Sequence, residues 1–219
     1  MSRIDHAERA ARRLGAVVAA GAAVTALPGL VRSVRGDGAS IGRPWLVLTP
    51  TRVPLVGAGW FAAMKAAWRP LPIRLGTAAR WTALVGGLAM YLSGMSLAVY
   101  GRLALGSSYR PSTTLGATLA PDRLVTTGPF AIVRHPMYLG LMVAAIGSTG
   151  LYRTWSTLWF VMQLPVLVVR ARREDALLAR TFGDAWTAYA AAAPAWLPFA
   201  QPGRSEGGRM TRQSVDRWL

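Results

Sequence analysis

A long apolar run in the middle of the chain limits the fold more than any other feature. Between Trp81 and Leu105 the only charged side chain is Arg102, close to the end of the run. A helix of about 20 apolar residues crosses the hydrocarbon core of a bilayer. Small residues in the run, such as Gly87 and Gly94, allow membrane helices to approach closely. We therefore expect a membrane-spanning helix here.

Further apolar segments precede this run. The segment from Leu14 to Val31 follows a charged start, Met1 to Arg13, which contains His6 and which we expect to be a solvated end. A cleaved signal peptide has a similar pattern, but no small-residue cleavage site closes the apolar segment. A weaker segment, Trp45 to Trp68, is expected to span the bilayer, kink, or lie in its interface.

The composition agrees with a membrane protein. Hydrophobic residues make up 53% of the 219 and charged residues 16%, a balance too apolar for an ordinary soluble domain. The formal net charge of +16 would suit nucleic acid, but the arginines lie between apolar segments and form no basic stripe. We expect membrane lipids as partners, with the arginines facing anionic headgroups, and no nucleic acid.

The cysteine and histidine counts exclude several kinds of site. The chain has no cysteine, which excludes disulfides, thiolate nucleophiles and cysteine-bound metals. Its two histidines, His6 and His135, are far apart in sequence and have few acidic neighbours. We therefore expect no metal site.

Two shorter apolar runs follow a polar connector, Gly106 to Val133. They extend from Met137 to Leu151 and from Trp155 to Val169, with Tyr152-Arg153-Thr154 between them. Each is short for a full span, so we expect a helical hairpin whose turn touches the far interface. Such a hairpin brings its own two ends together on one membrane face.

Charged residues mark both ends of this hairpin. Arg134 and His135 precede it, and a run from Arg170 to Asp175 follows it. Ionisable residues are costly near a bilayer and usually face a cavity or a partner. Guanidinium groups bind carboxylates or phosphates, and a carboxylate accepts hydrogen bonds from hydroxyls. The hairpin therefore predicts one polar site built from both ends.

The chain after Arg170 predicts an amphipathic helix. Apolar residues recur there at steps of three and four, as in Leu178, Phe182, Trp186 and Tyr189. We expect this helix to lie on the membrane surface or to fold back over the site. Most other tryptophans, Trp196 among them, are expected to serve the interface or packing.

Three motifs occur in a particular order along the second half of the chain. They are Leu124 to Phe130, Arg134 to Gly140, and Glu174-Asp175 followed by Leu178, Phe182 and Tyr189. Together they resemble the isoprenylcysteine carboxyl methyltransferase and phospholipid methyltransferase superfamily of integral membrane enzymes. The resemblance covers about residues 81–199.

The resemblance implies S-adenosylmethionine as methyl donor and a lipophilic acceptor, which is an isoprenylcysteine-type carboxylate, an isoprenoid or another lipid. It implies donor contacts from the turn before the hairpin, from the start of its first arm and from the acidic pair: Gly128, Pro129, Phe130, His135, Tyr138, Leu139, Gly140, Glu174 and Asp175. Catalytic roles are expected for Arg134 or Arg170, which would orient an acidic acceptor. Glu174 would position a proton or an arginine.

Some positions depart from the pattern of the superfamily. Phe130 stands where a tyrosine is common, and Ala131 and Ile132 stand where arginine and an aromatic residue are frequent. Asp175 replaces the usual second glutamate and is shorter. We expect these changes to shift substrate choice and not to abolish binding.

Two other functions stay open. An NADPH-dependent membrane reductase of the sterol reductase kind looks similar around the Arg-His-Pro stretch, although such proteins tend to carry asparagine where Met137 stands. A non-catalytic membrane binding protein would also fit the altered residues 130–132 and Asp175.

The sequence thus predicts an all-α integral membrane protein of about five transmembrane helices, with the C-terminal hairpin and tail helix forming the cofactor pocket. We expect N-terminal membrane helices in residues 1–80, a methyltransferase-like core in 81–199 and a flexible basic tail in 200–219. The basic residues from Arg170 onward favour a cytoplasmic C-terminus. Arginine-rich, alanine-rich composition suggests a bacterial inner membrane, with the donor site facing the cytoplasm. No sequence feature fixes the oligomeric state.

Overall fold

The computed structural model describes residues 2–34, 52–109 and 123–196. Within these ranges the chain forms helices and no β-strand, which confirms the all-α prediction. The helices are α1 (Arg3–Val34), α2 (Arg52–Ala66), α3 (Thr77–Leu105), α4 (Pro136–Tyr152), α5 (Trp155–Met162), α6 (Leu164–Phe182) and α7 (Asp184–Ala192), with the short 3-10 helices η2 (Gly106–Ser108) and η3 (Gly128–Ala131). The predicted tail, 200–219, lies outside the described residues.

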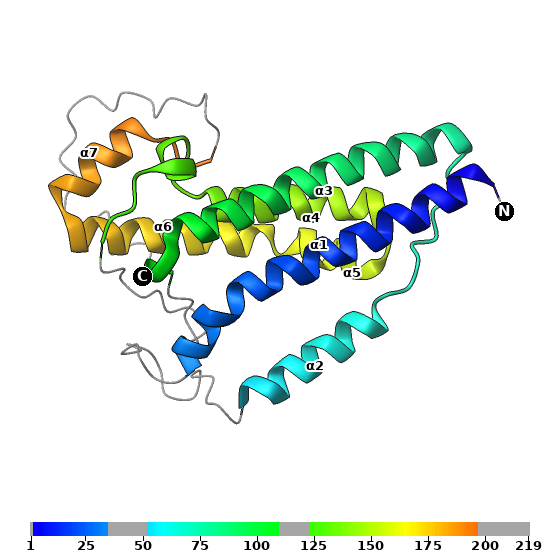
Figure 1. Ribbon diagram of the computed structural model, residues 1–219, viewed down its shortest axis with the longest axis horizontal. Coiled ribbons are helices and arrows are strands. Elements are labelled where there is room, and N and C mark those ends of the chain that lie inside the picture. Colours follow the sequence, from blue (N-terminus) through cyan, green and yellow to red (C-terminus); the bar gives the residue numbers. More distant parts are fainter. Residues whose placement is uncertain (1, 35–51, 110–122, 197–219) are drawn as a thin grey trace.

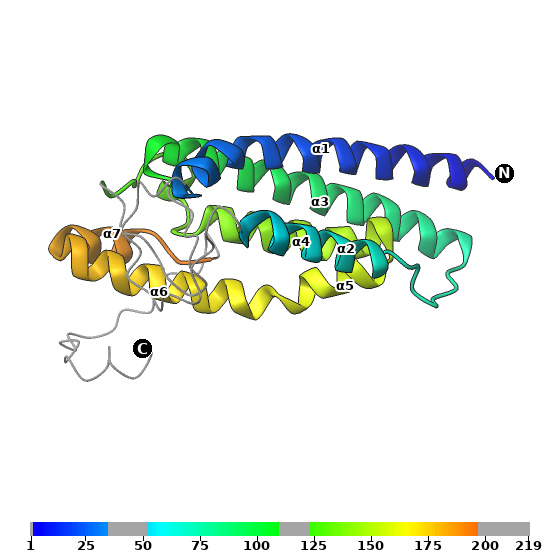
Figure 2. The same ribbon diagram turned by 90° about the horizontal axis from the view of Figure 1, so that it is seen from below.

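The long helices lie side by side along one axis. In Figures 1 and 2, α1, α3 and α4 run together, and α5 and α6 continue along the far side of α4 from α1. The N-terminus lies at one end of this bundle and α7 at the other. The ring of Trp60 in α2 meets that of Phe160 in α5 at a centroid distance of 6.0 Å.

Among the described residues, two helical stretches are long and apolar enough to cross a bilayer: Arg3–Pro28 of α1 and Thr77–Leu105 of α3. The apolar helix α4 is shorter. The predicted span in the middle of the chain is confirmed, although α3 begins four residues before Trp81. The prediction of about five spans is not confirmed.

The packing of α3 against α4 depends on small residues. A Cβ atom added to Gly94 would lie 2.4 Å from the backbone nitrogen of Ala144, and one added to Gly147 would lie 2.4 Å from that of Tyr91. No side chain fits between backbones at such distances. The contact resembles the small-residue interfaces of membrane helices, and it fixes α4, which carries part of the site, on α3.

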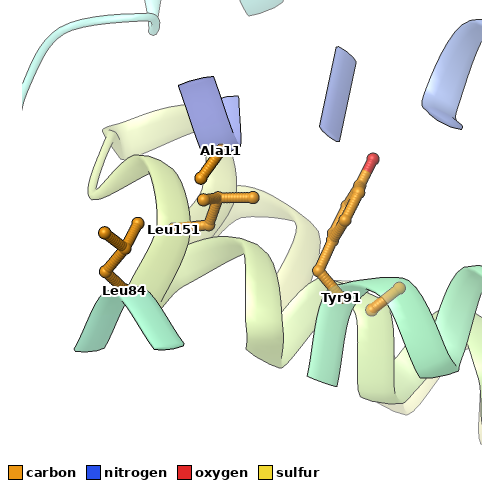
Figure 3. Packing of buried hydrophobic residues seen from close by; sticks show 5 residues of the cluster. Ala11, Leu84, Tyr91 and Leu151 are labelled. Carbon is orange, nitrogen blue, oxygen red and sulfur yellow. The ribbon is translucent and has the colours of Figure 1, made fainter. Parts of the chain in front are cut away.

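A small apolar core joins α1 to this pair (Figure 3). Ala11 of α1 lies in one buried cluster with Leu84, Tyr91, Ala144 and Leu151. The Tyr91 hydroxyl donates a hydrogen bond to the carbonyl of Gly15 in α1 at 3.1 Å. The core therefore involves helices from both halves of the chain.

The prediction of a solvated N-terminal end is wrong for one face of this segment, because α1 begins at Arg3 and its residues Ile4, Glu8 and Ala11 are buried. Glu8 is only 6% exposed. Its carboxylate accepts hydrogen bonds from Arg80 at 3.1 and 3.0 Å and from Arg153 at 2.6 Å. The charged start therefore packs against the start of α3 and the turn after α4, while His6 itself is exposed.

The predicted hairpin is present, but its second arm differs from the expectation. Arg153 ends α4 in a left-handed conformation (φ 53°), and a capping box of Thr154 and Thr157 starts α5. The helical hydrogen bonds are interrupted after Met162, because Pro165 has no N–H to donate. From there α6 runs without a break through the charged run, so the second arm and the start of the tail helix are joined. The predicted tail helix is interrupted at Gly183, where α6 ends, and its apolar residues Trp186 and Tyr189 lie in a separate helix, α7.

The α3–α4 contact generates a stability prediction. Gly94→Ala places a methyl group against the backbone of α4, which we expect to lower the free energy of unfolding by about 1–3 kcal/mol. The measurement is thermal unfolding of the detergent-purified protein. Gly86→Ala on the same helix is the matched control, because an added Cβ there has no neighbour within 4 Å. Equal midpoints for the two variants would contradict the packing described.

Candidate active site

The candidate site lies at the end of the bundle opposite the N-terminus, where the start of α4 meets α6 and α7 (Figure 1). Pro136 begins α4, and proline at the first helical position fixes the backbone angle that a helix needs. His135 precedes it as the N-cap residue. The sequence thus places Arg134 and His135 at a rigid helix start.

Asp175 of α6 binds both of these residues. Its Oδ2 lies 3.3 Å from Arg134 Nη2, and its Oδ1 lies 2.8 Å from His135 Nε2. The two ends of the hairpin therefore meet, as predicted. The shorter side chain of Asp175 is long enough to reach both partners.

Glu174, the neighbouring carboxylate, has a different set of partners. The Tyr138 hydroxyl donates a short hydrogen bond to Glu174 Oε1. Arg170, one helical turn earlier, forms an ion pair with the same oxygen, with its Nε at 3.5 Å. Burial alone would lower the pKa of Arg170. The neighbouring Tyr138 and Glu174 outweigh this effect, so the pKa of Arg170 is raised.

The ring of His135 is held between two other rings. Its centroid lies 5.8 Å from that of Tyr138 and 5.4 Å from that of Trp196. The backbone N–H of His135 donates to the carbonyl of Ala195 at 3.3 Å. Trp196 therefore packs on a site residue, within the packing role predicted for it.

Arg134 is engaged with α7 as well as with Asp175. Its Nη1 donates to the carbonyls of Ala190 and Ala193, both at 2.9 Å. Its guanidinium carbon lies 5.6 Å from the ring centroid of Trp186. Both terminal nitrogens of Arg134 therefore bond to protein groups.

A cavity of about 390 Å³ opens between these elements. This volume lies in the range of small-molecule sites. Six of the lining residues carry aromatic rings: Tyr109, Phe130, His135, Tyr138, Trp186 and Tyr189. Nine others are apolar: Leu105, Leu124, Val125, Pro136, Met137, Leu141, Leu167, Leu177 and Leu178. The remaining lining residues are Ser108, Arg123, Arg134, Arg170 and Glu174.

Five predicted donor contacts are absent from this wall: Gly128, Pro129, Leu139, Gly140 and Asp175. Gly140 faces α3, where an added Cβ would lie 2.5 Å from the nitrogen of Ala98. Gly128 has a φ of 62° and shapes the turn into η3. Asp175 lies behind the wall and acts on it through Arg134 and His135.

Some residues of the cavity wall, which come from the connector, were not predicted from the sequence. Tyr109 lines the wall, and burial raises its pKa. Arg102, buried at the end of α3, lies with its guanidinium carbon 4.1 Å from the Tyr109 ring centroid. Arg123 donates to Ser108 Oγ at 3.3 Å. No sequence signal identified this group, because it depends on the turn at Gly106 (φ 51°).

Comparison with known proteins identifies the central part of the chain. Residues 82–185, which include α4 and both carboxylates, match the phospholipid methyltransferase family. The match covers just under half of the chain. The predicted superfamily is thereby confirmed, and the phospholipid methyltransferase segment lies within the predicted core of 81–199.

The chain also has similar proteins among curated sequences. The chain is 33% identical over 126 residues to a nickel-cobalt-cadmium resistance protein of Alcaligenes xylosoxydans, covering 54% of this chain and 53% of that protein. It is 31% identical over 118 residues to a cobalt-zinc-cadmium resistance protein of Cupriavidus metallidurans, covering 51% and 49%. It is 38% identical over 77 residues to the protein-S-isoprenylcysteine O-methyltransferase of Schizosaccharomyces pombe, covering 34% and 33%.

The chain thus spans about half the length of two of these relatives and a third of the other. The family, together with the apolar helices α1 and α3, indicates a membrane protein. None of the described residues form a cluster of three or more His, Asp or Glu side chains that would hold a metal ion.

The contact between α7 and η3 generates a pH prediction. The Tyr189 hydroxyl donates to the carbonyl of Phe130 at 2.8 Å, and burial raises the pKa of Tyr189 to about 12. Because the folded state holds this proton more tightly than the unfolded state, its stabilising effect is complete below pH 10 and is lost towards pH 12. The ultraviolet absorbance of tyrosinate measures this. Wild type and Tyr189→Phe should give equal absorbance up to about pH 11, and a difference that develops near pH 10 would contradict the contact.

Proposed function

We propose that this protein is an S-adenosylmethionine-dependent methyltransferase that acts on a lipophilic acceptor at the membrane. One observation carries the proposal: a cavity with aromatic and apolar lining residues has Tyr138, Glu174 and Arg170 together on its wall, inside the phospholipid methyltransferase segment. The protein-S-isoprenylcysteine O-methyltransferase of Schizosaccharomyces pombe is similar to the chain over 77 residues.

The aromatic lining residues of the cavity fit the methyl donor. Trp186, Tyr189 and Phe130 offer ring faces on which a purine stacks and over which a sulfonium cation is attracted. The adjacent groups His135 and Glu174 supply hydrogen-bonding atoms for amino and hydroxyl groups. The volume suits a ligand of this size. The residues present therefore fit S-adenosylmethionine.

The apolar lining residues fit a lipid-like acceptor. Met137 and Leu141 of α4 and Leu167 of α6 line the cavity further along these helices, towards the apolar middle of the bundle. At 1.5 Å per residue, Leu141 lies about 9 Å along the helix axis from the level of His135. Leu141 is 39% exposed. An acceptor that enters from the bilayer would meet this side first.

The charged lining residues Arg170 and Glu174 are the candidates to act on the reacting groups. Bound S-adenosylmethionine supplies a methyl group on a sulfonium, and the new bond to the acceptor forms as the bond to sulfur breaks. Arg170, which is half-buried and charged, is placed to orient the acceptor. Glu174, held by Tyr138, is placed to hold Arg170 or to accept a proton from the acceptor. Alignment and exclusion of water are the main demands of such a displacement.

We further propose that the donor side of the cavity faces the cytoplasm of a bacterial cell, from which a water-soluble donor would enter. The acceptor is an isoprenylcysteine-type carboxylate, an isoprenoid or another lipid. Lipid mass spectrometry of cells with and without the protein would identify it by a shift of one methyl group.

Donor binding is the direct test of the cofactor. We expect calorimetry on the detergent-purified protein to detect binding of S-adenosylmethionine and S-adenosylhomocysteine, and no binding of NADPH. His135→Ala should weaken donor binding about tenfold or more, since it removes a wall group. His6→Ala, which changes the other histidine at the far end of the bundle, should bind as wild type does. Binding of NADPH alone would favour a reductase, and binding of neither ligand would leave a non-catalytic protein.

Glu174→Gln tests the catalytic assignment. We expect transfer of a labelled methyl group to a membrane lipid extract to fall about 100-fold, because a proton-accepting or arginine-holding charge is lost. Donor affinity should change much less. Asp184→Asn, at an exposed acid in α7, is the control and should leave transfer unchanged. Unchanged turnover in Glu174→Gln would remove this residue from the reaction.

A further inference from the structure

The helix α7 closes one side of the cavity. Trp186 and Tyr189, both from α7, belong to the cavity wall, and Trp186 is buried. In Figures 1 and 2, α7 turns back from the end of α6 and lies beside its last turns, at the end of the bundle opposite the N-terminus. A movement of α7 would therefore open the cavity next to Trp186 and Tyr189.

The joint between α6 and α7 is a single glycine. Gly183 has φ 53° and ψ −120°, a conformation that residues with a side chain rarely adopt. Its N–H caps α6 by donating to the carbonyl of Ala179 at 3.0 Å. A Cβ at this position would have no neighbour within 4 Å, so the joint is not packed against other elements. These are features of a hinge.

Away from this joint, the hydrogen bonds of α7 and the following strap, residues 193–196, run to the segment Phe130–His135. Tyr189 donates to the Phe130 carbonyl, and the backbone N–H of Arg134 donates to the Pro194 carbonyl at 2.8 Å. The side chain of Arg134 adds its two bonds to the carbonyls of Ala190 and Ala193. Arg134 thus makes more of these contacts than any other residue of the described chain.

The chemistry of a helix end explains why an arginine suits this position. The last carbonyls of a helix have no partner within the helix and carry partial negative charge. A planar guanidinium can donate to several oxygens at once, whereas a lysine ammonium cannot reproduce this fork. The other edge of the Arg134 guanidinium bonds to Asp175 of α6, which also bonds to His135 on the wall. Arg134 therefore links the position of α7 to a residue of the cavity.

We propose that Arg134 is a positioning residue that latches α7 over the cavity, and that α7 swings about Gly183 to admit and release the donor. The inference rests on the proposed function for the identity of the ligand. A charged nucleoside is unsuited to the apolar side of the cavity, so the side closed by α7 is its route. Closure then excludes water from the reacting groups.

The movement is measurable because the chain has no cysteine of its own. Ala188→Cys on α7 and Leu103→Cys on α3 are exposed positions for a pair of spin labels. We expect pulsed electron resonance to show a broad distance distribution without ligand and a narrow one with S-adenosylhomocysteine. Replacing Arg134 by lysine in this labelled pair should broaden the distribution in both conditions.

The same substitution is expected to change how fast the ligand leaves. In Arg134→Lys, S-adenosylhomocysteine should dissociate about tenfold faster than from wild type, because the loss of one charged hydrogen bond has that order of effect. Arg180→Lys, at an exposed arginine of α6, is the matched control and should match wild type. If Arg134→Lys does not fold, Tyr189→Phe is used in its place, because it removes the hydrogen bond from α7 to the Phe130 carbonyl.

The outcomes separate this inference from the proposed function. If S-adenosylhomocysteine binds but the distances stay the same in wild type and Arg134→Lys, α7 is a fixed wall and the latch is overturned. If Arg134→Lys releases α7 but S-adenosylhomocysteine does not bind, the latch stands and the proposed cofactor fails.

Discussion

The close contact of α3 and α4 is the constraint on which the rest of the structure depends. Where Gly94 faces Ala144, and Gly147 faces Tyr91, the two backbones are too close for a side chain between them. Dispersion between tightly packed surfaces, together with exclusion of lipid, holds such helices together. Because α4 is fixed in this way, its first residues present His135 and Tyr138 at a defined height. The residues of α6 and α7 then pack against a rigid edge.

Two adjacent carboxylates on α6 have different partners in the site. Asp175 lies behind the wall and holds Arg134 and His135, whereas Glu174 lies on the wall with Tyr138 and Arg170. Successive residues of a helix point about 100° apart, so neighbours in sequence face different groups. It is common for one charged residue to hold the wall of a site in place while its neighbour faces the ligand. Here Asp175 holds the wall, and Glu174 remains available for a ligand.

The sequence predicted the features that depend on local pattern. The span near Trp81, the hairpin and the meeting of its ends follow from apolar run lengths, and the superfamily follows from motif order. Other features depend on contacts between distant residues. The cluster at Glu8 joins three separate elements, and the wall at Tyr109 depends on the turn at Gly106. Pattern also could not show that Gly140 packs on α3, since a glycine in a motif looks the same in either role.

The ionic cluster at the far end of the bundle has a consequence for how the chain can change over time. Glu8 neutralises Arg80 and Arg153, which come from helix starts and turns that are otherwise independent in sequence. Loss of the acid leaves Arg153 without its carboxylate partner and Arg80 with Asp5 alone, and loss of either cation removes one of the partners of the acid. Substitutions at positions 8, 80 and 153 are therefore expected to be coupled. In a lineage that abandons one of these charges, the other two are expected to be replaced soon after.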